Sequence, residues 1–254
     1  MVCRTTLINE DMQLLKSLYK INSKSGKEAA IKAFVQGYLS TMNLDIRCDA
    51  FGNLFITKGV ADSYPTIVAH LDEVHDVENR KIVVEEDMIY ACDNGGNRVG
   101  LGADDKNGVW MALKLLEMKP ILKVALFVHE EKLNGEAGCR GSRFCNLAEF
   151  DNAMCLLQCD KRGAQEVVSV GKGDICLCEE GFIPQDILDR YGYQYTVGGR
   201  TDVVALRERG LDKNCCNISC GYYNAHKEDE YTLFSELENA LNFVSHVVDY
   251  SLNK

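Results

Sequence analysis

The sequence predicts a single α/β domain, residues 1–254, in which helices cover both faces of a mixed, mostly parallel sheet. Segments with strand character alternate with segments of helical periodicity, and this alternation is typical of parallel sheets. The chain has 254 residues, and 46% of them are hydrophobic, which is enough for a large core. The sequence has no internal repeat, low-complexity tract or linker, so a single domain is the simplest division.

Helices and hairpins are expected in the first part of the chain. Leucines spaced along one helix face indicate an amphipathic helix from about Asn9 to Lys20, and a second helix is expected from about Lys27 to Met42. Residues 49–53 have the composition of a hairpin turn, and a further hairpin is expected at 82–91. Strands are expected at 45–48, 54–58, 66–70, 82–86 and 88–91.

The second part of the chain continues the alternation. A helix is expected from Asp105 to about Met118, because apolar residues recur at helical spacing directly after two aspartates. Strands are expected at 123–128, 153–158, 166–170, 174–178 and 217–220. Helices are expected near 184–191, from 203 onward, and at 233–250, where a long helix closes the chain.

The net charge of −10 argues against two classes of partner. An acidic chain without a basic stripe does not favour the phosphate backbone of nucleic acids or an anionic membrane surface. No apolar run is long enough to span a membrane, and the N-terminus lacks the apolar segment of a signal peptide. We therefore expect a cytoplasmic protein that binds neither nucleic acid nor membrane.

The twelve cysteines are interpreted as reduced. Disulfide scaffolds belong to short secreted chains, whereas most cysteines here, such as Cys155, Cys159 and Cys220, lie within apolar runs. The chain contains no Cys-x-x-Cys pair, so a four-cysteine zinc site has no support. Its glycine-rich segments lack the spacing of dinucleotide-binding or phosphate-binding loops, so no nucleotide cofactor is implied.

Acidic residues and histidines cluster at the ends of several expected strands and at the start of a helix. They are His70 and Asp72 after 66–69, Asp104 and Asp105 before a helix, Glu130 and Glu131 after 124–128, and Asp160 after 153–159. The carboxyl ends of parallel strands meet at one edge of the sheet, so we expect these side chains to converge. Several carboxylates at close range repel each other unless positive charge lies among them. The simplest source of that charge is a pair of metal ions.

A site with two metal ions needs histidines, carboxylates and one carboxylate left free as a base. A water held between two zinc ions about 3.5 to 4 Å apart becomes a nucleophile near neutral pH, and the ions polarise the carbonyl under attack. Glu130 is the candidate base, because two neighbouring carboxylates at a turn can point in different directions. The candidate metal ligands are His70, Asp104, Glu131, Asp160 and His226.

These residues also have purely structural interpretations. A histidine at a strand end can be satisfied by a backbone carbonyl, and aspartates ahead of a helix can cap it. Capping suits Asp105 well and Asp104 poorly, so only Asp104 is expected to bind metal. His226 could instead lie on the surface among charged residues, and Arg200 could form a structural ion pair.

Five segments of the chain together resemble a known family. They are His70-Leu71-Asp72, Gly102-Ala103-Asp104-Asp105-Lys106-Asn107-Gly108, Glu130-Glu131, Asp160 and Asn224-Ala225-His226. In this order they resemble the co-catalytic zinc peptidases of the peptidase T, carboxypeptidase G and acetylornithine deacylase type. The resemblance implies a three-layer α/β/α phosphorylase/hydrolase-like fold and two divalent metal ions. Zinc is expected, with cobalt or manganese as alternatives, because mixed carboxylate and imidazole ligands admit several divalent ions.

The resemblance implies a particular division of the metal ligands. One zinc ion would be bound by His70 and Asp160. The other would be bound by Glu131 and His226. Asp104 would bridge the two ions.

The resemblance also implies roles beyond metal binding. Asp72 would lie behind His70 and accept its ring proton, which fixes the nitrogen that faces the metal. Glu130 would be the base that passes a proton from the water to the leaving amine. The segment 198–202 resembles a loop that lines the substrate pocket in these enzymes, so Arg200 or the backbone there is expected to contact substrate.

Two departures from the family pattern concern segment lengths. Many relatives of the peptidase T type insert a lid domain between the metal aspartate and the glycine-rich loop, but only residues 161–197 separate them here. We therefore expect no lid or dimerisation domain, as in the single-domain aminopeptidases of the same superfamily. The segment after the glutamates, 132–138, is slightly longer than the usual Glu-Glu-x-Gly pattern.

The expected function is that of a zinc-dependent exopeptidase, an aminopeptidase acting on short peptides, because without a lid the metal edge is open to a chain end. Within hydrolases, the alternative is an amino-acid deacylase or carboxypeptidase that cleaves an acylated amino acid. A third hypothesis is a non-catalytic relative that uses its acidic edge to bind a partner. The sequence leaves the oligomeric state open.

Overall fold

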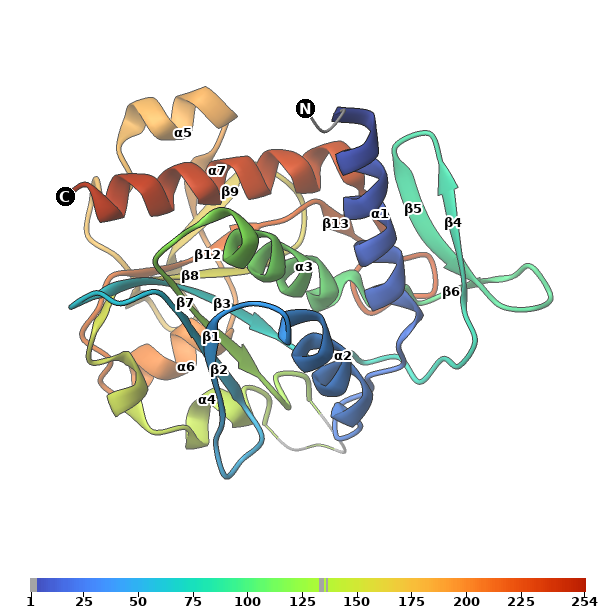
Figure 1. Ribbon diagram of the computed structural model, residues 1–254, viewed down its shortest axis with the longest axis horizontal. Helices are drawn as coiled ribbons and strands as arrows, with labels where there is room; N and C mark the ends of the chain where they lie inside the picture. Colours follow the sequence, from blue (N-terminus) through green and yellow to red (C-terminus); the bar gives the residue numbers. More distant parts are fainter. Residues whose placement is uncertain (1–3, 133–134, 136) are drawn as a thin grey trace.

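A computed structural model describes residues 4–132, 135 and 137–254. Among these residues, nine strands form a central sheet in the order β1-β2-β7-β3-β8-β12-β9-β10, with β11 beside β9 (Figure 1). In that order the strands are β1 (Leu44–Cys48), β2 (Leu54–Lys58), β7 (Leu122–Phe127), β3 (Tyr64–His70), β8 (Ala153–Lys161), β12 (Cys215–Ser219), β9 (Glu166–Gly171), β10 (Ile175–Cys176) and β11 (Gln194–Val197).

The centre of this sheet is parallel, and its margins are antiparallel. Strands β7, β3, β8 and β12 run in one direction, whereas β2 and β9 run against their inner neighbours. The register aligns Ile67 of β3 with Val124 on one side and Leu157 on the other. The carboxyl ends of these neighbouring strands therefore meet at one edge, as the sequence predicts.

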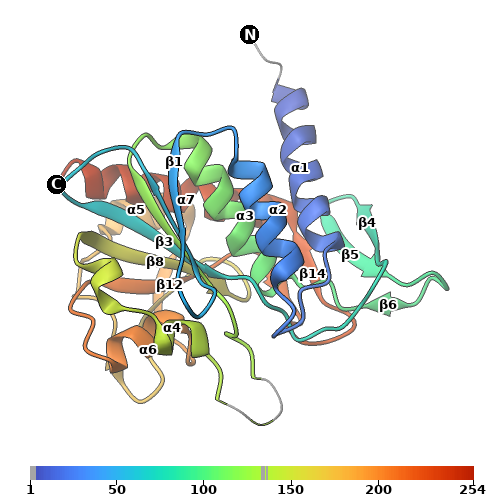
Figure 2. The ribbon, with the colours of Figure 1, turned by 60° about the horizontal axis from the view of Figure 1, so that its bottom comes forward.

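Alternation along the central strands separates two cores. On β3, Ile67 and Ala69 face one core and Val68 faces the other, because successive side chains of a strand point to opposite faces. The first core also contains residues of α1 (Arg4–Lys20), α2 (Ala29–Leu39), α3 (Ala103–Met118), α5 (Gln185–Tyr191) and α7 (Phe234–Leu252). The second contains residues of α6 (Asp202–Glu208), which packs beside α4 (Arg140–Phe144) on the opposite face (Figure 2). The predicted helix layers on both faces are confirmed.

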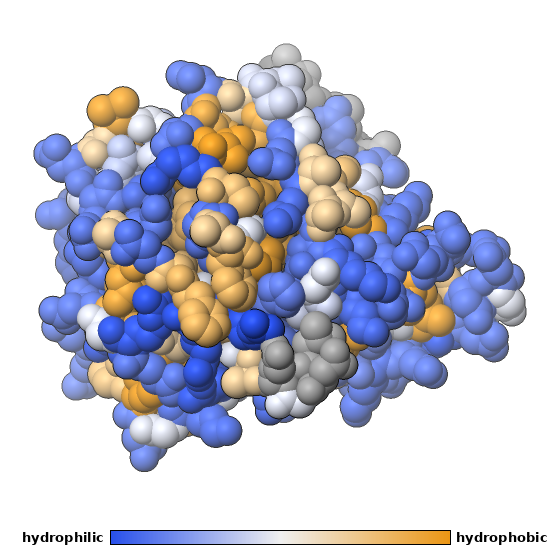
Figure 3. Space-filling view, turned by 90° about the horizontal axis from the view of Figure 1, so that it is seen from below, coloured by the Kyte–Doolittle hydropathy of each residue, from blue (hydrophilic) through white to orange (hydrophobic). Residues whose placement is uncertain are grey.

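A second, smaller sheet projects from one side of the molecule (Figure 1). It consists of β4 (Lys81–Glu85), β5 (Met88–Cys92), β6 (Arg98–Val99), β13 (Tyr222–Tyr223) and β14 (Tyr231–Leu233). The hairpin of β4 and β5 is predicted by the sequence, but the sheet is not. Strand β14 is only three residues long and pairs with β5 from far along the chain, so it has no local sequence pattern. The projection is mostly hydrophilic at its surface (Figure 3).

Several element boundaries differ from the sequence prediction. Helix α2 is shorter than expected, because the chain turns at Ser40, whose N–H donates to the carbonyl of Gly37. Strand β8 extends further than expected, so Asp160 lies inside it. Helix α4, strand β11 and the 3₁₀ helix Leu147–Phe150 are not predicted from the sequence.

Two further expectations concern the state of the cysteines and the presence of membrane-spanning helices. Eight of the eleven described cysteines are buried, and none of the eleven forms a disulfide, in agreement with their interpretation as small apolar residues. No helix in the described part of the chain is both long and apolar enough to cross a membrane.

Candidate metal centre

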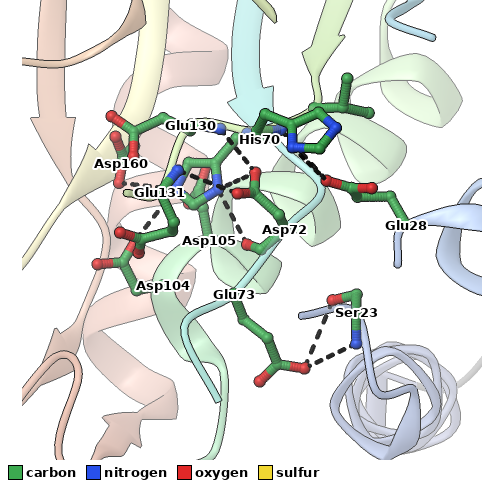
Figure 4. A network of polar contacts seen from close by, with 12 residues as sticks. Ser23, Glu28, His70, Asp72, Glu73, Asp104, Asp105, Glu130, Glu131 and Asp160 are labelled. Atoms are coloured by element: carbon green, nitrogen blue, oxygen red, sulfur yellow. Dashed lines mark hydrogen bonds and ion pairs between the residues drawn. The ribbon is translucent and has the colours of Figure 1, made fainter. Parts of the chain in front are cut away.

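The predicted metal ligands and the candidate base come from five separate segments and meet at the carboxyl edge of the central sheet. Figure 4 shows the acidic side chains gathered around His70. His70 ends β3, Asp160 lies near the end of β8, and Glu130 and Glu131 follow β7. Two other segments complete the group: the start of α3 supplies Asp104, and the turn between β13 and β14 supplies His226.

Asp104 lies between the two histidines. Its Oδ1 is 3.1 Å from Nε2 of His70, and its Oδ2 is 3.2 Å from Nε2 of His226. Each histidine contacts a second carboxylate: Nε2 of His70 is 3.6 Å from Oδ1 of Asp160, and Nε2 of His226 is 2.7 Å from Oε1 of Glu131. The five residues therefore form two half-sites that share one carboxylate.

The donor set and spacing fit a pair of divalent cations. Two ligand atoms on a tetrahedral zinc ion are about 3.3 Å apart when each metal–ligand bond is about 2.0–2.1 Å. The separations between the histidine nitrogens and the carboxylate oxygens, 2.7 to 3.6 Å, bracket that value. Potential ligand atoms of His70, Asp104 and Glu131 all lie within 4.8 Å of one another. Imidazole and carboxylate are ligands that zinc, cobalt and manganese accept.

Asp105 is close to the same cluster but is already engaged. Its Oδ1 accepts the N–H of Gly108, and its Oδ2 accepts the N–H of His70. The first bond caps the helix, as the sequence predicts, and the second joins α3 to the end of β3. The peptide bond between Asp104 and Asp105 is cis.

Asp72 organises the residues around it. One carboxylate oxygen accepts the N–H of Glu130 at 2.9 Å, and the other accepts the N–H of Glu131 at 3.0 Å. Nδ1 of His70 is 3.0 Å from the carbonyl oxygen of Asp72 and 3.4 Å from its carboxylate, so the carbonyl is the nearer acceptor for the ring proton. Burial raises the pKa of Asp72, but His70 and the two amide donors outweigh burial and lower it.

The carboxylates of the cluster carry more negative charge than the positive groups of the protein around them can neutralise. Burial, followed by the charge of Asp104, raises the pKa of Asp160 to about 8. Burial also raises the pKa of Glu130 and of Glu131. Hydrogen bonds to Asp104 and Glu131 raise the pKa of His226 to about 11. Bound cations would take the place of these protons.

A buried acid that the sequence analysis did not single out holds Asp104 in place. Glu230 is fully buried, and its carboxylate accepts the N–H of Gly102 at 2.6 Å and the N–H of Asp104 at 3.2 Å. Glu230 lies only four residues after His226, so the same short segment supplies His226 and holds the backbone of Asp104. Nothing in the local sequence indicates that Glu230 reaches the start of α3.

A cavity of about 710 Å³ opens over the cluster. The segment 197–201 forms part of its wall, together with Asp104, Glu130 and His226. Arg200 lines this cavity as well, and its guanidinium donates a hydrogen bond to Glu208.

Asp202 is buried at the start of α6 with half of its carboxylate unpaired. Its Oδ1 accepts the hydroxyl of Ser142, and its Oδ2 has no hydrogen-bond partner among the described residues. Burial, together with the charges of Asp72 and Glu131, raises the pKa of Asp202 to about 7, although His70 and the Ser142 hydroxyl lower it.

We expect the Asp202→Asn variant to stabilise the metal-free protein clearly more at pH 8 than at pH 5. A folded pKa near 7 means that the folded state keeps the proton that the unfolded chain releases near pH 4. Stability is therefore lost as pH rises from about 4 to about 7. The gain should be a few kcal/mol at most. Unfolding with urea at both pH values measures it, with the exposed Asp212→Asn as control. Equal effects at both pH values would contradict the expectation.

The architecture belongs to the class of α/β folds with a mostly parallel central sheet, and solved peptidase structures share this fold. A tripeptidase from Staphylococcus aureus superposes with a TM-score of 0.77 at 14% sequence identity, covering 96% of this chain and 98% of that one. The aminopeptidase PepT from Bacillus cereus gives a TM-score of 0.76 at 14% identity, covering 95% and 98%. No family model and no curated protein matches the sequence.

The same fold also occurs under a different name. A protein from Thermotoga maritima called an endoglucanase gives a TM-score of 0.66 at 12% identity, covering 94% of this chain and 97% of that one. Since one fold can host several activities, the activity of this chain is set by the residues of its site.

Proposed function

We propose that the protein is a metal-dependent exopeptidase, an aminopeptidase that removes residues from the amino end of short peptides. The observation that supports this most directly is the position of Asp104, whose two carboxylate oxygens face different histidines in two half-sites. In this proposal His70 and Asp160 would hold one divalent ion, Glu131 and His226 would hold the other, and Asp104 would contribute a ligand to both. Zinc is the expected ion. When bound, the two ions would polarise the scissile carbonyl and activate a water.

Glu130 is proposed to move the proton. Its neighbour Glu131 contacts His226, whereas the Glu130 carboxylate, within the described part of the chain, is hydrogen-bonded by the thiol of Cys139 and by neither histidine. Burial raises the pKa of Glu130, which favours a group able to accept a proton and then release it to the leaving amine. Asp72 binds the amides of both glutamates and so fixes their different directions.

Several features support a peptide substrate and an open site. The chain has the fold of proteins named tripeptidase and aminopeptidase. The segment 161–197, where a lid would be inserted, forms the helix α5 and the strands β9, β10 and β11 of the central sheet. We therefore propose one catalytic domain without a lid, acting in the cytoplasm, with Arg200 at the wall of the cavity in contact with the substrate.

The test compares peptides with free and blocked amino ends. After reconstitution with zinc, we expect the protein to hydrolyse a tripeptide and to cleave its N-acetylated form at least about 100-fold more slowly, because a site made for an ammonium group rejects an analogue without it. Release of amino acids, followed by chromatography, measures both rates. A chelator should abolish the activity.

Other outcomes would identify another function. Faster cleavage of acylated amino acids than of free tripeptides would favour a deacylase. If the fully metal-loaded protein hydrolysed neither series, the aminopeptidase proposal would be wrong and a binding role would replace it.

A further inference from the structure

The residues that follow β7 pair with the residues that begin α4. The N–H of Cys139 donates to the carbonyl of Glu130 at 2.7 Å, that of Arg140 to the carbonyl of His129, and that of Gly141 to the carbonyl of Val128. Three successive amides thus pair with three successive carbonyls. This pairing holds Cys139 directly beside Glu130.

The approach is close enough to require particular residues. A Cβ atom at Gly138 would lie 2.4 Å from the carbonyl oxygen of Glu130, so only glycine fits there. Cys139 follows in the left-handed conformation, with φ of 59°. Its side chain is buried, with 2% exposed, and its Sγ lies 3.1 Å from Oε1 of Glu130.

The thiol of Cys139 is a hydrogen-bond donor at this position. Burial and the negative charges of Glu130 and Asp202 raise the pKa of Cys139, so the sulfur keeps its proton. A protonated thiol beside a carboxylate oxygen donates S–H to that oxygen. Among the residues that the structure describes, no other group hydrogen-bonds the Glu130 carboxylate.

We infer that Cys139 is a positioning residue that holds the Glu130 carboxylate in its orientation over the metal centre through an S–H···O bond. This inference rests on the proposed function, in which Glu130 moves the proton. A general base acts only within hydrogen-bond reach of its proton, so a Glu130 side chain free to rotate would react in fewer encounters. The backbone hydrogen bond from Cys139 to Glu130 fixes the position of Cys139. The thiol of Cys139 then orients the Glu130 carboxylate.

The kinetic test uses three variants of the full chain loaded with zinc. Cys139→Ala should lower kcat about tenfold, with KM changed less than about twofold and with the metal content of the wild type, because a hydrogen bond to a charged group is lost. Cys139→Ser keeps a donor and should restore most of kcat. Cys139→Gly, which also lacks a donor and suits the left-handed backbone, should behave like Cys139→Ala. An alanine variant with full kcat, or a serine variant as slow as alanine, would overturn the inference.

An infrared measurement tests the contact without any assay of hydrolysis. The S–H band of Cys139, isolated as the difference between the wild type and Cys139→Ser, should shift when Glu130→Gln is introduced, because a carboxylate is a stronger acceptor than an amide. The control is Cys145, another buried thiol, whose sulfur donates to the carbonyl of Ser142 and whose band should not move. An unmoved Cys139 band would overturn the inference. A shifted band in a protein without peptidase activity would instead leave the contact intact and count against the proposed function.

Discussion

Replacing Glu130 by glutamine is expected to lower kcat by about 10²- to 10⁴-fold while the protein still binds two metal ions per chain. Glutamine has nearly the same shape, and the backbone amide of residue 130 can still donate to Asp72. The substitution removes only the ability to accept a proton. Tripeptide turnover and elemental analysis of the same preparation measure the two quantities.

The matched control is the adjacent residue. Glu131→Gln changes the same functional group one position along the chain, but Glu131 contacts His226 and is proposed as a ligand. We expect this variant to lose both metal and activity, whereas Glu130→Gln loses activity alone. A Glu130→Gln variant with the turnover of the wild type would show that another group is the base.

Asp104→Ala is expected to abolish the binding of both metal ions. Its two oxygens serve different half-sites, so its loss removes a ligand from each ion and leaves the remaining histidines and carboxylates too few to hold either. Substitution of residues that merely support a ligand already lowers affinity about 10- to 100-fold, and loss of a shared ligand should exceed that range. Elemental analysis after dialysis against a weak chelator measures the content.

Two single-sided variants make this result specific. His226→Ala and Asp160→Ala each remove a ligand from one half-site only, so each should retain about one ion per chain. The unfolding midpoint of every variant checks that the fold is kept. Two ions retained by Asp104→Ala, or none retained by either single-sided variant, would contradict the shared-ligand arrangement.

The sequence predicts the centre of the molecule well because local pattern and final packing agree there. Strands β3, β7 and β8 are apolar runs buried on both faces, and each is followed, or nearly ended, by a polar residue of the site. The direction of parallel strands then brings His70, Glu131 and Asp160 to one edge without any further information.

The rest depends on contacts between distant segments. Glu230 reaches the amide of Asp104, and the thiol of Cys139 reaches Glu130, yet each occupies an unremarkable position in its own loop. Strand β14 forms by pairing with β13 and with β5, which lies far away in the sequence. Such features have no periodicity of their own, since they follow from tertiary contacts rather than from local preference.

The small projecting sheet makes the two halves of the centre unequal. His70 stands on the central sheet and is 1% exposed, whereas the His226 side chain is 49% exposed and sits in a turn between β13 and β14, two short strands of the projection. Separation of the β4–β5 hairpin from β14 would thus destabilise the turn that carries His226 and leave the position of His70 unchanged. The half-site that contains His70 should stay fixed, whereas the half-site that contains His226 should open when the peripheral sheet separates.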